Sequence, residues 1–104
     1  MSPSSQSLAS SLVHEVVAGE PYVYLPLGKY VVRAPGVCGG RPTFKYTRIE
    51  VSFILNRIAQ GKSVDYIVEA YTDPHLTHAA IQEAMQLANS AFLSSPQIIE
   101  PIAA

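Results

Sequence analysis

The sequence predicts a mainly α protein, a tri-helical, homeodomain-like or winged-helix-like helix-turn-helix bundle preceded by a short β-hairpin. Three observations lead to this fold class. The 104 residues suit one domain with one modest core. The second half contains three consecutive amphipathic segments joined by brief turns, which would bury their apolar stripes against one another. Ahead of them, β-branched and aromatic residues flank Pro26 and Gly28, as in a hairpin.

The first twenty residues are expected to form an N-terminal arm, disordered in part or folded as a short helix. Residues 1–11 include six serines, a composition that is poor in core-forming side chains. Leu8, Leu12 and Val16 then recur at helical spacing, and Gly19 is placed where a helix would end.

A single domain is expected over residues 21–93, followed by a C-terminal tail at 94–104. The strands fall within about 22–47. Two of them, near 22–25 and 29–33, would form the hairpin, and the stretch TFKYT would add a third. The glycines and proline of GVCGGRP are turn residues between these strands.

The three helices are expected at about 51–60, 63–71 and 77–93. In each, apolar residues recur close to the i, i+3, i+4, i+7 spacing of one helix face. Ser63 and Thr77 are good N-cap residues for the second and third helices. These last two helices and the turn TDPH match the helix-turn-helix architecture. The expected apolar faces are Val51, Ile54, Leu55 and Ile58, then Val64, Ile67, Val68 and Tyr71, then Ile81, Ala84, Met85, Ala88 and Phe92.

The composition favours a cytoplasmic protein with a partner. A single cysteine excludes an internal disulfide framework, and neither a membrane-spanning run nor a secretory signal is visible. Hydrophobic content of 48% with only 14% charged residues leaves apolar surface to bury, which favours a homodimer. Residues 1–62 hold seven basic and three acidic groups, a net charge of +4, whereas 63–104 hold five acidic groups and no Lys or Arg.

An ordered string of motifs carries a resemblance to a known family. GGRPTFKYTRIEV is followed by an apolar helix, then by GKS, IVEAY and PHLT. From about residue 30 to 92 this string resembles the domain-of-unknown-function family 433, whose signature begins roughly Gly-Lys/Arg-Pro-x-Ile-x-Gly-Thr-Arg-Ile-x-Val. The positions that match are Gly40, Arg41, Pro42, Phe44, Thr47, Arg48, Ile49, Val51, Gly61, Ser63, Pro74, Leu76 and Thr77.

The resemblance implies a helix-turn-helix fold and a role in a toxin–antitoxin pair, because members are regarded as antitoxin components similar to VapB-type proteins, encoded beside PIN-like nucleases. The sequence departs from the family in two places. Tyr46 stands where the family has glycine, so the backbone must differ there if that glycine requires a positive φ. Thr72 and Asp73 lengthen the turn before Pro74.

The segment CGGRPTFKYTR holds most of the candidate site residues. Gly40, Arg41, Pro42, Thr47 and Arg48 form a structural motif, in which Arg48 would tie the hairpin to the bundle through hydrogen bonds to carbonyls or carboxylates. A contact of Arg48 with a partner or a phosphate is the alternative. Lys45 and Tyr46, both expected at the surface, are candidates for a contact with DNA or with a protein partner.

The third helix offers a second candidate contact. Gln82, Gln86 and Asn89 recur at i, i+4, i+7 and form an amide stripe able to hydrogen-bond adenine edges. Glu83 lies beside that stripe, and the absence of Lys and Arg from residues 63–104 weakens phosphate binding. A solvated polar face is the alternative interpretation.

No catalytic, cofactor-binding or metal site is predicted. Asp73, His75 and His78 are close in sequence, but the two histidines straddle a helix start and do not converge as zinc ligands should. Cys38 has no recognisable base beside it and is interpreted as a small residue in a turn. GVCGGRP is separated from any helix by an extended segment, which argues against a phosphate loop.

The resulting functional hypothesis is a protein that is not an enzyme. The lead hypothesis is an antitoxin-like interaction protein that binds and masks a PIN-like nuclease. The alternative is a DNA-binding transcriptional regulator of helix-turn-helix type, and a hydrolase or metal enzyme is a third class. The expected partners are thus a second copy of the chain, a nuclease or DNA, and no membrane.

Overall fold

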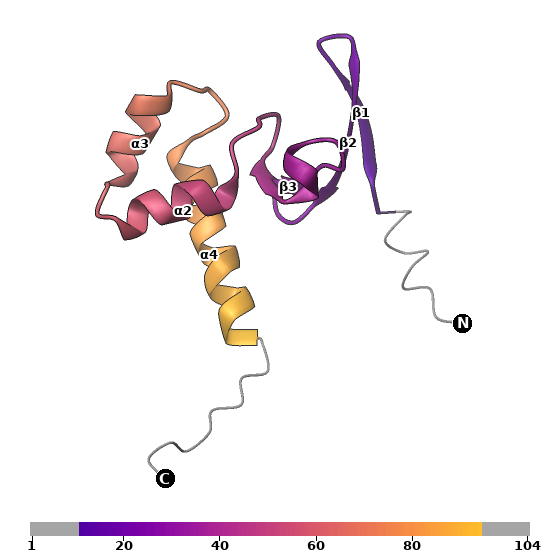
Figure 1. Ribbon diagram of the computed structural model, residues 1–104. Coiled ribbons are helices and arrows are strands. Elements are labelled where there is room, and N and C mark those ends of the chain that lie inside the picture. The colour runs from indigo at the N-terminus through magenta and orange to yellow at the C-terminus, as the bar shows by residue number, and fades with distance from the viewer. Residues whose placement is uncertain (1–10, 95–104) are drawn as a thin grey trace.

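The computed structural model describes residues 11–94 (Figure 1) and corrects the predicted fold class. Within these residues the chain forms a four-stranded antiparallel sheet and three α-helices, so it is not a mainly α tri-helical bundle. The elements are β1 (Val13–Val17), β2 (Glu20–Pro26), β3 (Val31–Arg33), the 3-10 turn η1 (Cys38–Gly40), β4 (Pro42–Phe44), α2 (Val51–Ala59), α3 (Val64–Tyr71) and α4 (His78–Ser94).

The sheet is a meander in which every strand pairs with its sequence neighbours. Its order is β1-β2-β3-β4, and all three pairings are antiparallel. The β1–β2 hairpin stands away from the helices, whereas β3 and the short β4 lie toward them (Figure 1). The predicted hairpin was therefore only the middle part of a larger sheet.

The predicted N-terminal arm is wrong over its described part, because Val13–Val17 is a strand and not a helix. Ala18 and Gly19 have φ values of 52° and 80°. Positive φ at both central residues is the geometry of a type I′ turn, whose twist suits a two-residue hairpin connection. Gly19 thus turns a hairpin instead of ending a helix. Leu8, the first residue of the predicted helical pattern, lies outside the described residues.

Strand β3 contributes to both of the apolar clusters. Val31 faces the helices and joins the main core, while Val32 packs on the other face of the sheet with Tyr24 and Ala34. Successive side chains of a strand point to opposite faces, which explains the division. The main core consists of Val31, Phe44, Val51, Ile54, Ile67, Leu76, Ala80, Ile81 and Ala84.

Helices α3 and α4 begin at side-chain caps. The Ser63 hydroxyl accepts a hydrogen bond from the Tyr66 N–H at 3.0 Å, and the Thr77 hydroxyl accepts one from the Ala80 N–H at 3.1 Å. Both N-caps were predicted, and each satisfies a backbone donor that the first turn of a helix leaves free. Compared with the expected ranges, α2 ends one residue earlier, α3 begins one residue later, and α4 begins and ends one residue later.

Helix α4 is packed along only part of its length. Ala80, Ile81 and Ala84 are buried, but residues 88–94 are all exposed. Figure 1 shows this end of α4 extending beyond the rest of the molecule. The apolar face predicted for this helix is therefore divided into a buried half and a free half. Between residues 11 and 94, none of the helices has the length and apolar content to cross a membrane.

Candidate functional site

Glu83 of α4 holds the turn between β2 and β3. Its Oε2 accepts a hydrogen bond from the Lys29 N–H at 2.8 Å. Its Oε1 accepts from the Tyr30 N–H at 2.7 Å and from the Val31 N–H at 3.1 Å. A carboxylate that accepts several backbone N–H groups forms charge-assisted bonds, which are stronger than neutral ones. One side chain thereby fixes the sheet to the longest helix.

The sequence indicates that Glu83 lies beside the amide stripe, but its role in holding the β2–β3 turn was not predicted. Its position did carry a signal, because Glu83 lies three residues after the buried Ala80 and four before the half-buried Leu87. Residues at these spacings share one face of a helix. A charged residue on a packed face needs a partner, although the sequence does not show that the partner is a turn more than fifty residues away.

Tyr46 adopts the left-handed conformation itself, with φ of 68°. The backbone was expected to differ only if the family glycine requires a positive φ, and Tyr46 has a positive φ itself, so no such difference is needed. The Tyr46 N–H donates to the Tyr22 hydroxyl at 2.9 Å, and the Tyr46 hydroxyl donates to Glu15 Oε1 at 2.8 Å. A left-handed residue with a Cβ costs roughly 1–2 kcal/mol. These two hydrogen bonds offset part of that cost.

Three tyrosines, Tyr22, Tyr24 and Tyr46, form a connected group that we call the tyrosine cluster. The ring centroid of Tyr22 is 5.1 Å from that of Tyr24 and 5.4 Å from that of Tyr46, and the Tyr46 ring is 5.2 Å from His75. These tilted contacts fall in the range favoured by aromatic pairs. The cluster joins the β1–β2 hairpin to the loop after β4 and to the loop before α4.

Glu15 and Lys45 supply the charges around the tyrosine cluster. The Tyr24 hydroxyl donates to Glu15 Oε2 at 2.7 Å. This bond, and then the one from Tyr46, lower the pKa of Glu15 because both stabilise the carboxylate. The Lys45 Nζ lies 4.9 Å from the ring centroid of Tyr24 and 5.1 Å from that of Tyr46. A hydrogen bond with Tyr24 is the main cause that raises the pKa of Lys45.

The residues of the predicted structural motif lie together around β4. Thr47 is buried, and its hydroxyl donates to the Phe44 carbonyl at 2.7 Å and accepts from the Ile49 N–H at 3.0 Å. Arg41 Nε forms a salt bridge with Glu50 Oε2 at 2.7 Å, just before α2. Gly40 has a φ of 81° and accepts a bond from Arg33, and Pro42 begins β4.

Arg48 occupies a different place from the one expected. It is exposed, and its guanidinium forms no hydrogen bond with any residue between 11 and 94. The connection between the β4 region and the helices that was expected of Arg48 is made instead by Arg41 and Glu50. The Arg48 backbone carbonyl does accept a bond from the Cys38 thiol at 3.4 Å, which holds Cys38 against the loop.

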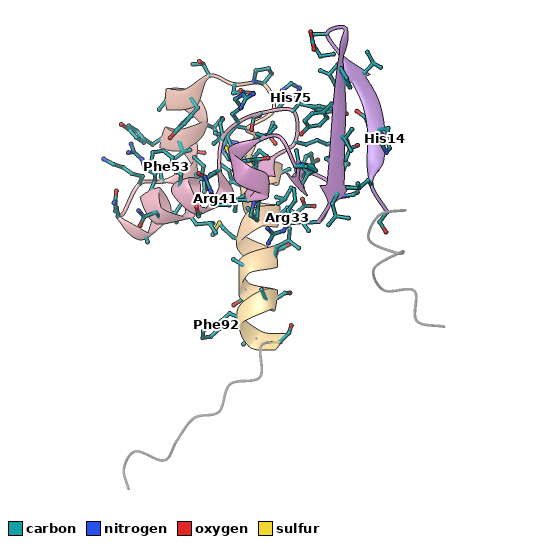
Figure 2. All side chains as sticks on the ribbon, turned by 45° about the vertical axis from the view of Figure 1, so that its right-hand side comes forward. His14, Arg33, Arg41, Phe53, His75 and Phe92 are labelled. Carbon is teal, nitrogen blue, oxygen red and sulfur yellow. The ribbon has the colours of Figure 1, made fainter. Side chains whose placement is uncertain are left out.

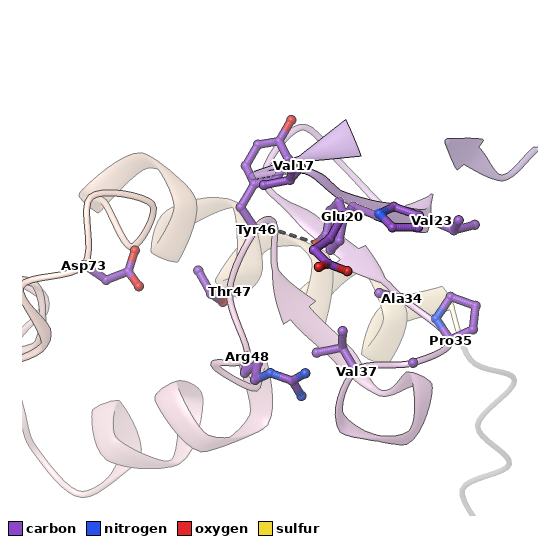
Figure 3. A pocket seen from close by; sticks show the side chains of 13 residues that line it. Val17, Glu20, Val23, Ala34, Pro35, Val37, Tyr46, Thr47, Arg48 and Asp73 are labelled. Atoms are coloured by element: carbon purple, nitrogen blue, oxygen red, sulfur yellow. Dashed lines mark hydrogen bonds between the residues drawn. The ribbon is translucent and has the colours of Figure 1, made fainter. Parts of the chain in front are cut away.

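A wide cleft of about 880 Å³ lies beside the β1–β2 hairpin. Tyr46, Thr47 and Arg48 line one side of it, and the loop at 34–37 lines the other (Figure 3). Its charged lining residues are Glu20, Arg48 and Asp73. The lining of this cleft therefore holds one guanidinium and two carboxylates among uncharged residues, and it gathers no set of groups that would do chemistry.

The histidine-containing turn does not form a metal centre. The His75 N–H donates to Asp73 Oδ1 at 2.8 Å, whereas the His78 ring pairs with Asp65 of α3. These histidines therefore have separate carboxylate partners. Over the part of the chain that the structure describes, no three His, Cys, Asp or Glu side chains converge as metal ligands.

The amide stripe of α4 is open to solvent. Gln82, Gln86 and Asn89 are all exposed. The free end of the same helix also carries the large apolar side chains Phe92 and Leu93, and Figure 2 shows Phe92 near that end. The structure thus places a polar stripe and an apolar end on one helix.

A family model described as "Protein of unknown function (DUF433)" matches residues 31–88, more than half of the chain. The chain belongs to this family. The resemblance found from the motifs is therefore confirmed, and the antitoxin-like description stays a prediction. Neither the search of curated proteins nor the search of solved structures gave a match.

The matched residues, which we call the family segment, begin at β3 and leave the β1–β2 hairpin outside. Tyr46 lies within the family segment, but its partners Tyr22 and Glu15 belong to the hairpin. Tyr46 therefore connects the family segment to the strands that precede it.

Proposed function

We propose that the protein is a non-enzymatic, antitoxin-like interaction protein that binds a PIN-like nuclease through the free end of α4. The observation that carries this proposal is the exposure of the large apolar side chains there. Phe92 and Leu93 are 67% and 71% exposed, and Met85 is 39% exposed. Large apolar side chains exposed on one helix end favour an interaction site, and aromatic and methionine side chains are common anchors.

The chemistry of the helix supports burial against a protein. Residues 84–94 contain no charged side chain, so covering this end desolvates no charge. Met85 and Phe92 are seven residues apart and share a helix face, with Ala88 between them. An apolar helix face that fits a groove of the partner is a recurring recognition mode. The nuclease as partner class comes from the family resemblance.

The test is co-expression of the full chain with the nuclease encoded beside it. We expect the pair to copurify and the protein to relieve growth arrest caused by the nuclease. Phe92→Ser combined with Met85→Ser is expected to abolish both effects. Val16→Ser is the matched control, because Val16 is 75% exposed but lies on β1. If the double variant still binds, or if Val16→Ser is equally defective, the α4 surface is not the interface.

A DNA-binding regulator is the second candidate, because the three residues of the amide stripe, Gln82, Gln86 and Asn89, are all exposed. Amide side chains that reach the major groove hydrogen-bond adenine. This candidate predicts binding of upstream duplex DNA that falls steeply with salt, and weakening by Gln86→Ala. Absence of binding at low salt rules it out.

A further inference from the structure

A second, smaller cavity of about 290 Å³ lies between three segments that are far apart in sequence. The turn after β2 contributes Lys29 and Tyr30, and the turn after β4 contributes Lys45 and Tyr46. The loop at 74–77, which leads into α4, completes the lining. This volume lies just below the range of roughly 300–1,000 Å³ that is typical of small-molecule sites.

The cavity combines two aromatic rings with two ammonium groups. The Lys29 Nζ lies 5.3 Å from the ring centroid of Tyr30, and the Lys45 Nζ lies 5.1 Å from that of Tyr46. Neither ammonium lies within 4 Å of a carboxylate of the described residues. Thr77, at the start of α4, adds the positive end of a helix dipole. His75 lines the cavity as well.

No carboxylate lines this cavity, although three lie close to it. Each of the three is directed to another donor. Glu83 accepts backbone N–H groups of the β2–β3 turn, Glu15 accepts two tyrosine hydroxyls, and Asp73 accepts the His75 N–H. The lining itself therefore carries two lysines and no carboxylate, while the three nearby carboxylates keep their negative charge outside it.

Hydrogen bonds to neighbouring residues also hold the lining residues of the cavity in place. The Lys45 N–H donates to the Tyr30 carbonyl at 2.8 Å, which joins the first two segments. The Tyr46 N–H is held by Tyr22, and the Thr77 hydroxyl is held by the Ala80 N–H. A ligand would therefore enter a site whose backbone is already ordered, and this lowers the entropic cost of binding.

We propose that this cavity binds a small molecule that joins a planar aromatic ring to a phosphate group, of the size of a nucleoside monophosphate. The aromatic part would contact the ring of Tyr30, and the Tyr46 ring, which already packs against Tyr22 and His75, would bound it. The two ammonium groups and the start of α4 attract the phosphate, which carries nearly two negative charges at neutral pH. The site goes beyond the proposed function, because it lies at the opposite end of α4 from Phe92.

The test is isothermal titration calorimetry of the full chain with AMP, adenosine and inorganic phosphate. We expect saturable 1:1 binding of AMP, at least about tenfold tighter than adenosine or phosphate alone, since a charge-assisted contact is typically worth a tenfold change or more. Phosphate that binds as tightly as AMP would overturn the aromatic half of the proposal. No saturable binding of AMP would overturn the whole.

Matched variants locate the site. Lys29→Gln and Lys45→Gln are each expected to weaken AMP binding about tenfold. Lys62→Gln is the control, because the Lys62 Nζ lies in a similar position over a tyrosine ring, 5.1 Å from the centroid of Tyr66, but on another surface. Equal affinities in all three variants would contradict the assignment. Phe92→Ser should leave AMP binding intact, so this proposal and the nuclease proposal can fail separately.

Discussion

The carboxylate of Glu83 occupies the space that a side chain at Gly28 would need. A Cβ at Gly28 would lie 2.6 Å from Cδ of Glu83 and 2.7 and 2.8 Å from its two oxygens. Real contacts of Cβ are not that short, so the carboxylate would have to move. The absence of a side chain at residue 28 is thus what lets α4 bind the β2–β3 turn at hydrogen-bond distance.

Gly28→Ala is expected to lower the free energy of unfolding by about 1–3 kcal/mol, because the displaced carboxylate leaves backbone N–H groups without their acceptor. Urea unfolding followed by circular dichroism measures the change. Gly36→Ala is the matched control, since no atom lies within 4 Å of its Cβ position and its φ is not positive. We expect that control to be neutral or slightly stabilising. Equal losses in both variants would show that Glu83 is not the cause.

A double-mutant cycle isolates the contact between residues 28 and 83. Glu83→Ala alone should also destabilise the protein by about 1–3 kcal/mol. In that background, Gly28→Ala should cost little, because the side chain that it displaces is gone. Additive losses would contradict the geometry. Glu69→Ala, at an exposed position of α3, serves as the control for loss of a helical glutamate.

Tyr46 gives a prediction that separates backbone strain from side-chain contacts. Both Tyr46→Ala and Tyr46→Gly remove the contacts of the ring with Tyr22 and Glu15. Only glycine relieves the left-handed backbone, so Tyr46→Gly should be about 1 kcal/mol more stable than Tyr46→Ala. Thermal unfolding of the two variants measures the difference. At Ser52 in α2 the order should reverse, since glycine disfavours a helix. The same order at both positions would disprove left-handed strain at Tyr46.

The lowered pKa of Glu15 predicts a specific dependence of stability on pH. The carboxylate is stabilised in the folded state, first by Tyr24 and then by Tyr46. Its contribution is therefore fully present above the ordinary glutamate pKa and is lost as the pH falls through the lowered value. NMR titration of the Glu15 carboxyl carbon should show its pKa rising in Tyr24→Phe, and by less in Tyr46→Phe.

Tyr66→Phe is the control for that titration, because Tyr66 lies on α3, away from Glu15. It should leave the pKa of Glu15 unchanged. An unaltered pKa in Tyr24→Phe would show that the hydrogen bond between the Tyr24 hydroxyl and Glu15 does not form in solution.

The parts of the fold that were predicted correctly depend on patterns within a few neighbouring residues, namely helical spacing and N-caps. The helical spacing of Val51 and Ile54 and the caps at Ser63 and Thr77 involve residues within one or two turns of each other. The family motifs GGRPTFKYTR and PHLT are also local strings, and the match over residues 31–88 confirms the family that they indicated. Such patterns can be recognised without knowing how the rest of the chain folds.

Patterns of neighbouring residues gave the wrong prediction where the pairing of strands decided the structure. Leu12 and Val16 have helical spacing, but Val13–Val17 becomes a strand because β2 offers it a partner. The same glycine, Gly19, is compatible with the end of a helix and with a hairpin turn. Single-sequence patterns do not choose between these outcomes when the segment is short, and so the fold class was wrong.

The sequence by itself determined the three helices, the caps at Ser63 and Thr77, and the membership of a family. The tertiary structure alone decided that Glu83 holds the β2–β3 turn, that Tyr46 joins the hairpin to the family segment, and that Lys29 and Lys45 share a cavity. The physical reason is sequence separation. Helix periodicity and capping act within a few residues, whereas these contacts join residues 16 to 54 positions apart and form only once the sheet and helices have packed.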